Sequence, residues 1–191
     1  MKDQGNVYVE KCAIFIDGGY LKSVLKRINN FPLDYLKFSD KISRLISCSR
    51  LRTYYYDCLP IRRESEKSNY LFNSRKKFFQ KLNFLPRFEV SLGELQFIAG
   101  QYKQKKIDVL MSLDIADKCF EEQIAHAVLV AGDSDYIPAI KRAKSYGAIV
   151  HLFSYKDSVN KEMIGEVDEF HILDEDFLLD CKLEERSTIS S

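Results

Sequence analysis

The sequence predicts an α/β fold in which a central, mainly parallel β-sheet lies between two layers of helices. Short apolar runs of strand length alternate with longer segments whose apolar residues recur at helical spacing, as in parallel sheets. The runs at residues 13–16 and 127–131 are continuously apolar, which is typical of central strands covered on both faces. We expect these two to lie side by side. The predicted strands are residues 13–16, 51–56, 127–131, 149–153 and 170–173.

Helical spacing of apolar residues predicts the covering helices. They are expected at residues 20–28, 36–46, 64–81, 109–120 and 136–145, with Gly147 as a stop signal after the last. Residues 87–100 alternate around Leu92 and Gly93, which is typical of a strand pair or a β-excursion. The polar residues 101–106 after Gly100 are interpreted as a mobile loop.

The 191 residues are expected to form one domain over residues 12–183, with tails at 1–11 and 184–191. No apolar run approaches the roughly 20 residues that cross a bilayer, so no membrane partner is expected. The polar N-terminal stretch lacks the pattern of a signal peptide, which makes the cytoplasm the expected compartment. The five cysteines are scattered without C-x-x-C spacing, which favours neither a disulfide framework nor a cysteine zinc site.

Aspartates follow two of the predicted strands. Asp17 comes directly after the run at 13–16 and precedes two glycines, while Asp133 and Asp135 follow the run at 127–131. Ligands of parallel sheets bind outside the carboxyl ends of the strands, and carboxylates gathered there repel one another unless a cation neutralises them. A divalent metal is therefore expected. The competing interpretation is that Asp17 and Asp133 only cap the helices that follow.

Two further aspartates belong to the predicted helix at 109–120 or its start. Asp114 stands among Val, Leu, Met and Ile residues, where an unpaired carboxylate is costly to bury, so we expect it to face a cation. Asp108 is open between a helix cap and a metal ligand. Asp117 is expected to face solvent.

Oxygen ligands without a His or Cys cluster favour Mg²⁺ or Mn²⁺ over zinc. The three histidines, His126, His151 and His171, lie beside or within predicted strands, and we expect them to be packed or surface-exposed rather than catalytic. No Ser/His/Asp or Cys/His set is legible. Metal-activated water is therefore the expected nucleophile, which indicates hydrolysis of a phosphate ester.

Basic residues are concentrated in part of the chain. Residues 62–81 hold seven Lys or Arg against two Glu, which suits a polyanion, although a solvated helix face has the same composition. The residues expected to track a phosphate backbone are Arg62, Arg63, Arg75, Lys76, Lys77, Lys103, Lys105 and Lys106. Tyr102, or exposed members of Tyr54–Tyr56, are candidates for stacking on a base, and alternate rings of the latter are expected in the core.

Three motifs occur in a fixed order along the chain. They are Phe15-Ile16-Asp17-Gly18-Gly19-Tyr20, Lys106-Ile107-Asp108-Val109 with Asp114, and Gly132-Asp133-Ser134-Asp135-Tyr136. In this order they resemble the NYN domain, a PIN-like family that includes the LabA-like proteins, from about residue 12 to 173. The resemblance implies a PIN-like three-layer α/β/α sandwich whose acidic pocket binds Mg²⁺ or Mn²⁺ for ribonuclease chemistry. It implies catalytic roles for Asp17, Asp114, Asp133 and Asp135, and metal-ligand roles for these four and Asp108.

The expected partner is accordingly single-stranded or structured RNA, and the aromatic segment 70–84 offers a face for a homodimer. One alternative is a non-catalytic RNA-binding or scaffold module that retains the acidic pocket. A hydrolase of the haloacid-dehalogenase kind also begins with an Asp after a buried strand, but it requires a second acid where this chain has Gly19.

Overall fold

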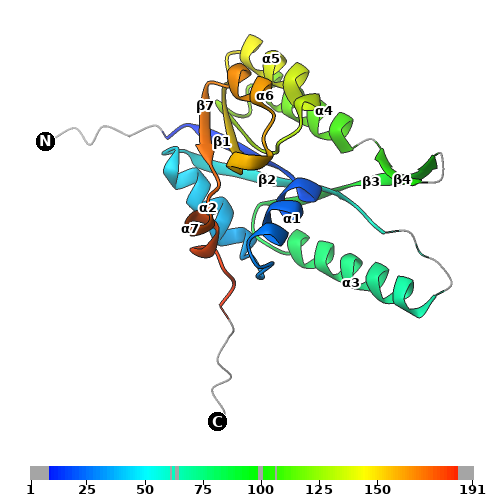
Figure 1. Cartoon of the computed structure of the whole chain (residues 1–191). Helices are drawn as coiled ribbons and strands as arrows, with labels where there is room; N and C mark the ends of the chain where they lie inside the picture. The colour runs from blue at the N-terminus through cyan, green and yellow to red at the C-terminus, as the bar shows by residue number, and fades with distance from the viewer. Residues whose placement is uncertain (1–8, 61, 63–64, 99–100, 106, 185–191) are drawn as a thin grey trace, which may run out of the picture.

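The computed structural model describes residues 9–60, 62, 65–98, 101–105 and 107–184, of which residues 94–98 and 101–105 are described by their backbone. A seven-stranded sheet with the order β4-β3-β2-β1-β5-β6-β7 forms its centre (Figure 1). Six strands, β3, β2, β1, β5, β6 and β7, pair in parallel, and β4 pairs antiparallel with β3 at the edge of the sheet. The strands are β1 (Lys11–Asp17), β2 (Ser49–Cys58), β3 (Phe88–Ile98), β4 (Gln101–Lys105), β5 (His126–Val130), β6 (Ile149–Ser154) and β7 (Glu169–Ile172).

All five predicted strands are confirmed, and β1 pairs with β5 as expected from their unbroken apolar runs. Chain order reverses at β1, because β2 and β3 extend the sheet on one side while β5, β6 and β7 extend it on the other. Such a reversal opens a crevice outside the carboxyl ends of the strands. The topology therefore places the ends of β1 and β5 at the position where ligands bind in doubly wound sheets.

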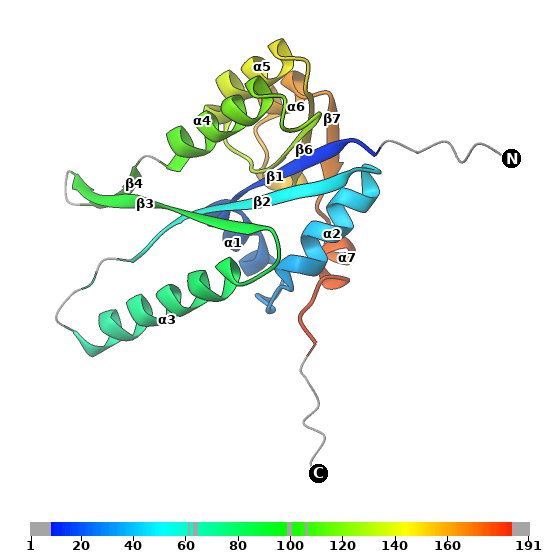
Figure 2. The same cartoon turned by 180° about the vertical axis from the view of Figure 1, so that it is seen from behind.

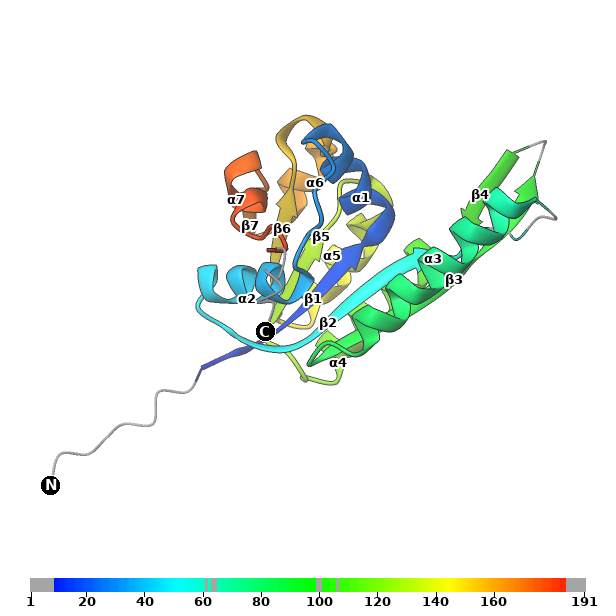
Figure 3. The same cartoon turned by 90° about the horizontal axis from the view of Figure 1, so that it is seen from below.

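One face of the sheet is covered by α1 (Gly18–Arg27), α2 (Tyr35–Leu45), α3 (Glu66–Asn83) and α7 (Glu175–Leu179). Each begins at a residue whose side chain accepts a hydrogen bond from a backbone N–H in the first turn, as helix N-termini require. Their apolar sides pack on Cys12, Ile14 and Ile16 of β1. Figure 3 shows α3 beside β3 at one end of the sheet and α7 beside β7 at the other.

The opposite face is covered by α4 (Ile107–Phe120), α5 (Ile137–Ser145) and α6 (Lys161–Glu166). Met111 and Ile115 of α4 pack with Ala13 and Phe15, the alternate residues of β1. Short 3₁₀ turns, η1 (Ser134–Tyr136) and η2 (Lys156–Ser158), follow β5 and β6. The result is the predicted three-layer α/β/α sandwich, and Figure 2 shows the sheet between its helix layers from behind.

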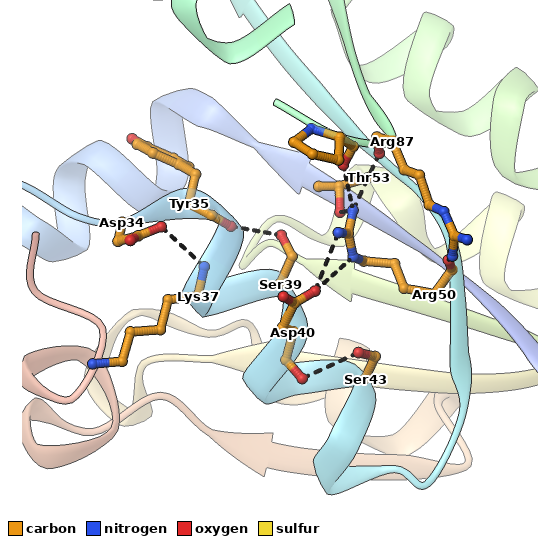
Figure 4. Close-up of polar contacts among 10 residues, drawn as sticks. Asp34, Tyr35, Lys37, Ser39, Asp40, Ser43, Arg50, Thr53 and Arg87 are labelled. Carbon is orange, nitrogen blue, oxygen red and sulfur yellow. Dashed lines mark hydrogen bonds and ion pairs between the residues drawn. The ribbon is translucent and has the colours of Figure 1, made fainter. Parts of the chain in front are cut away.

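A buried arginine fastens α2 to the sheet. Arg50 of β2 is 8% exposed and pairs through its guanidinium with Asp40 of α2 at 3.1 Å. The same group donates to the carbonyl oxygens of Pro86 and Arg87, just before β3, at 3.3 and 3.2 Å (Figure 4). Because a guanidinium carries five N–H donors, one side chain satisfies all of these acceptors. Arg50 thus links β2 to α2 and to the segment that precedes β3.

The expectation of a mobile loop at residues 101–106 was wrong for residues 101–105. These form β4, which pairs antiparallel with the second half of β3, and residues 88–98 form one strand rather than a strand pair. An edge strand needs no apolar face, and lysines on it discourage pairing with other chains. A polar run such as QYKQK can therefore be a strand without showing the usual pattern. Lys106 lies outside the described residues.

Within the described ranges, no helix combines the length and apolar character that crossing a bilayer requires.

Candidate acidic site

The carboxylate of Asp17 lies where β1 ends and α1 begins. Its Oδ1 accepts a hydrogen bond from the Tyr20 N–H at 2.9 Å, so the capping interpretation is correct as far as it goes. Its Oδ2 has a different partner, the hydroxyl of Tyr136, at 3.1 Å. One oxygen of Asp17 thus caps a helix and the other points into the site.

Tyr136 brings a second carboxylate to the same point. Its hydroxyl also lies 3.0 Å from Oδ1 of Asp108, in the first turn of α4. A phenol has a single proton and donates it to one acceptor at a time. Two carboxylates therefore share one donor, and the negative charge of the pair is only partly compensated. The Tyr136 ring is fully buried, which fixes the hydroxyl in this position.

The raised pKa of Asp17 also indicates that negative charge at this site is only partly compensated. Burial raises the pKa of the Asp17 carboxyl, the hydrogen bonds from Tyr20 and Tyr136 lower it, and the charges of Asp108 and Asp57 raise it further. The net pKa lies above the ordinary value. A site that disfavours its own negative charge is stabilised by a proton or by a metal cation.

Asp57 is a member of this site that the sequence reasoning missed. It stands at the end of β2, is 5% exposed, and accepts from the Cys58 N–H at 2.7 Å. Its other oxygen forms an ion pair with Arg75 of α3. The rule that identified Asp17 would also have identified Asp57, because Asp57 directly follows the predicted strand at 51–56 just as Asp17 follows the one at 13–16.

Two cations lie on the α1 and α3 side of the site. The Arg75 guanidinium stacks over Phe78 and Phe79, with its central carbon 4.8 and 4.7 Å from the ring centres. Burial lowers the pKa of Lys22 in α1, with Arg75 adding to the effect and the charge of Asp57 opposing it. Lys22 and Arg75 both line a cavity of about 470 Å³, together with Tyr35, Tyr55 and Phe78.

Asp114 has a tyrosine hydroxyl as its hydrogen-bond partner. Its Oδ2 accepts a hydrogen bond from the Tyr56 hydroxyl at 2.7 Å, and its side chain is half-buried. This bond gives the carboxylate one polar partner, and a cation at Asp114 stays a prediction. Asp114 follows Asp108 by almost two helical turns, and the hydroxyl of Tyr136 joins Asp108 rather than Asp114 to Asp17.

Asp133 and Asp135 lie after β5 and are both exposed. Asp133 caps the turn η1, because its Oδ1 accepts from the Asp135 N–H at 3.2 Å. The turn ends at the buried Tyr136, so both aspartates lie within three residues of it in the sequence.

Gly132 is required for the shape of this corner. A side chain there would overlap the Tyr20 ring and the carbonyl oxygen of Ser158. The Tyr20 hydroxyl lies 2.5 Å from the Ser154 hydroxyl and accepts from the Tyr155 N–H at 2.8 Å. These contacts hold the start of α1 against the end of β6, so Tyr20 fixes the frame in which Asp17 sits.

Of the predicted phosphate-binding residues, some are exposed, some are paired with other side chains, and some lie outside the described residues. Lys76 and Lys77 of α3 are exposed, and exposed Arg62 donates to Asn69 at 2.9 Å. Arg75 is engaged by Asp57. Arg63 and Lys106 lie outside the described residues, as do the side chains of Tyr102, Lys103 and Lys105. All three tyrosines of Tyr54–Tyr56 are buried, so none offers its ring for base stacking.

The acidic residues fit Mg²⁺ or Mn²⁺. Asp17 and Asp108 converge on one hydroxyl and offer hard oxygen donors. In the described part of the chain, no three carboxylates bring ligand oxygens within 4.8 Å of one another. Mg²⁺ usually keeps several waters and takes one or two carboxylates together with substrate phosphates. A pair of carboxylates is therefore a sufficient protein contribution for this ion.

Comparisons with known proteins agree with this fold. The family model of the NYN domain matches residues 11–174. The chain is similar to VPA0982 of Vibrio parahaemolyticus RIMD 2210633, a solved protein of unknown function, with a TM-score of 0.69 and 22% identity over 90% of this chain and 98% of that one. It is also 38% identical over 58 residues to the uncharacterized protein y4oD of Sinorhizobium fredii (strain NBRC 101917 / NGR234), matching 30% of this chain. The match covers 27% of the length of y4oD.

Proposed function

The chain belongs to the NYN domain family, whose members are generally nucleases of the PIN-like kind, and from this premise we propose that it is a metal-dependent ribonuclease. The observation that carries the proposal is the convergence of Asp17 and Asp108 on the single hydroxyl of Tyr136. Such a pair of undercompensated carboxylates at a topological switch point is suited to a divalent cation.

Asp17 and Asp108 are proposed to hold Mg²⁺ or Mn²⁺. When bound, such an ion supplies an activated water and neutralises charge on a phosphodiester. Tyr136 holds the two carboxylates at a fixed spacing, because its hydroxyl contacts both and its ring is immobilised in the core. Exposed Asp133 and Asp135 are proposed to orient the attacking water from the end of β5. Asp114 is assigned a positioning role through the hydroxyl of Tyr56.

The proposed substrate is RNA, bound on the α1 and α3 side of the acidic site. Lys22 supplies a cation for a phosphate next to the carboxylates, and exposed Lys76 and Lys77 continue the positive charge along α3. Tyr35 and Phe78, which are half-buried and line the same cavity as Lys22, give it aromatic walls on which an unstacked base can rest. Arg75 contributes less to phosphate binding than the sequence indicated, because its charge is paired with Asp57.

Cleavage of a labelled single-stranded RNA in Mn²⁺ tests this function, with single-stranded DNA of the same sequence alongside. Wild-type protein is expected to cut the RNA and to stop when EDTA is added. Asp17→Asn and Asp108→Asn remove a metal ligand, which is worth several kcal/mol, so the rate should fall by at least about 100-fold. Asparagine also caps helices well, so the Asp17→Asn variant should stay folded.

Asp117→Asn is the matched control, because Asp117 is an exposed residue of the same helix as Asp108. It should cleave at the wild-type rate. If wild-type protein cleaves neither RNA nor DNA in Mn²⁺ or Mg²⁺ but still binds RNA, the chain is a binding module and the nuclease proposal fails. Equal loss of activity in the control would show that the effect is not specific to the acidic site.

A further inference from the structure

Three histidines form a row across β5, β6 and β7, which we call the histidine row: His126, His151 and His171. The ring centres of neighbouring members lie 5.2 and 5.5 Å apart, and the rings are stacked. The sequence predicted packed or surface-exposed histidines, and it did not predict this clustering. Sequence distance hid it, because strand pairing, and not chain order, brings the three side chains together.

The histidine row is separate from the acidic site. Strand pairing places Ile14 of β1 level with Val128 of β5 and with His151 of β6. His151 is therefore level with a point three residues before Asp17 and two strands across, or about 10 Å along the strands and about 10 Å sideways. A ligand of this cluster cannot be shared with Asp17.

Glu169 completes a set of three ligand atoms with two of these histidines. His151 Nδ1 lies 3.3 Å from His171 Nε2 and 3.3 Å from Glu169 Oε2, and His171 Nε2 lies 3.4 Å from the same Oε2. The three atoms form a nearly equilateral triangle. Glu169 and His171 are two residues apart on β7, which directs both side chains to one face of the sheet.

The size of the triangle matches one face of a tetrahedral metal site. An ion held about 2.0–2.1 Å from each donor in a tetrahedron sets the donors about 3.3–3.4 Å apart, whereas octahedral geometry sets neighbouring donors about 2.8–3.0 Å apart. Two imidazoles and one carboxylate are a donor set that Zn²⁺ accepts, with a water in the fourth position. We propose that His151, Glu169 and His171 form a zinc site between β6 and β7.

Outer contacts orient His151 for this role. His151 Nε2 lies 2.9 Å from His126 Nδ1, and His126 Nε2 lies 2.7 Å from Oε2 of Glu10. An ionised carboxylate only accepts, so the His126 proton is on Nε2 and its Nδ1 accepts from His151 Nε2–H. A neutral His151 is then left with a lone pair on Nδ1, which is directed at His171 Nε2 and at the Glu169 carboxylate. A carboxylate–histidine chain behind a ligating imidazole is the usual support of a metal site.

That lone pair faces the carboxylate oxygen of Glu169. Two electron-rich atoms 3.3 Å apart repel unless a proton or a metal ion lies between them. His151 is 2% exposed, and burial disfavours a charged imidazolium. A cation between the three donors removes the repulsion without protonating the buried ring. The side chain of Glu169 is exposed and that of His171 is partly exposed, which leaves a route for the ion to enter from the surface.

Metal binding by tag-free, EDTA-treated protein tests the proposal. Isothermal titration with Zn²⁺ should give one site per chain that is lost in Glu169→Gln, a surface change that leaves the core intact. Asp17→Asn should keep this site, which separates it from the acidic site. His126→Phe, which removes only the outer support, should weaken Zn²⁺ binding on the order of 10- to 100-fold.

Co²⁺ provides a spectroscopic reading of geometry that does not depend on activity. Bound Co²⁺ should show the intense visible absorption of a tetrahedral complex in wild-type protein and lose it in Glu169→Gln. The proposal is overturned if Zn²⁺ does not bind, or if Glu169→Gln and wild-type protein bind it equally. A weak absorption typical of six-coordinate cobalt would equally contradict the tetrahedral site.

Discussion

Replacing Tyr136 by phenylalanine removes one oxygen atom from the centre of the acidic site. The hydroxyl contacts Oδ2 of Asp17 at 3.1 Å and Oδ1 of Asp108 at 3.0 Å, while the buried ring keeps its packing. The hydroxyl has one proton, so the loss counts as one hydrogen bond to a charged acceptor, about 1.5–3 kcal/mol. For a chain of this size a loss near 2 kcal/mol lowers the midpoint of thermal unfolding by about 4–8 °C.

Urea unfolding in EDTA measures this loss, with Tyr54→Phe as the matched control. Tyr54 is also buried and stacks on Phe15, but its hydroxyl makes no hydrogen bond to the residues that the structure describes. The control should change the free energy of unfolding by no more than about 0.5 kcal/mol. Equal stabilities of Tyr136→Phe and Tyr54→Phe would refute the view that one hydroxyl holds the two carboxylates.

Three other predictions concern the surroundings of the sites. Gly132→Ala should lower the free energy of unfolding by about 1–3 kcal/mol, because the new methyl group overlaps a backbone carbonyl. Gly165→Ala is the control, because a methyl group there meets open space and should not destabilise the protein. Equal stabilities of the two variants would contradict this prediction. Burial lowers the pKa of His171 below its ordinary value near 6.5, so the unfolded chain binds the proton more tightly. Metal-free protein should therefore lose stability as the pH falls below about 6.5, and an unchanged slope in His171→Asn would count against this. Arg75→Met leaves the buried carboxylate of Asp57 without its ion-pair partner and should lower the free energy of unfolding by about 3 kcal/mol or more. Adding Asp57→Asn should restore part of this loss in the double variant. Additive losses from the two substitutions would argue against the ion pair.

The sheet was predictable because its central strands have an unambiguous pattern. A strand buried on both faces is apolar at nearly every residue. The sequence therefore predicted both β1 and β5 and their pairing. The edge strand β4 has no such requirement and was taken for a loop. Backbone pairing alone defines it, and backbone groups are the same for every sequence.

The candidate site was predictable at its strand ends and less so on its helices. Asp17 was found because a buried strand ends there, and the same logic extends to Asp57. The helix aspartates depend on side-chain partners from other elements of the fold. A tyrosine of β2 satisfies Asp114, and Tyr136 ties Asp108 to Asp17. Neither contact can be predicted from sequence spacing. In the motif that contains Tyr136, the sequence predicted a role for the aspartates but none for the tyrosine hydroxyl.

The location of bound Mn²⁺ tests the central claim most directly. Crystals soaked in Mn²⁺ and measured near the manganese absorption edge should show an anomalous peak in contact with carboxylate oxygens of both Asp17 and Asp108. The same soak of Asp108→Asn crystals should lose most of that peak. A peak bound only by exposed residues such as Asp133 and Asp135, or no peak near β1 at all, would contradict the account.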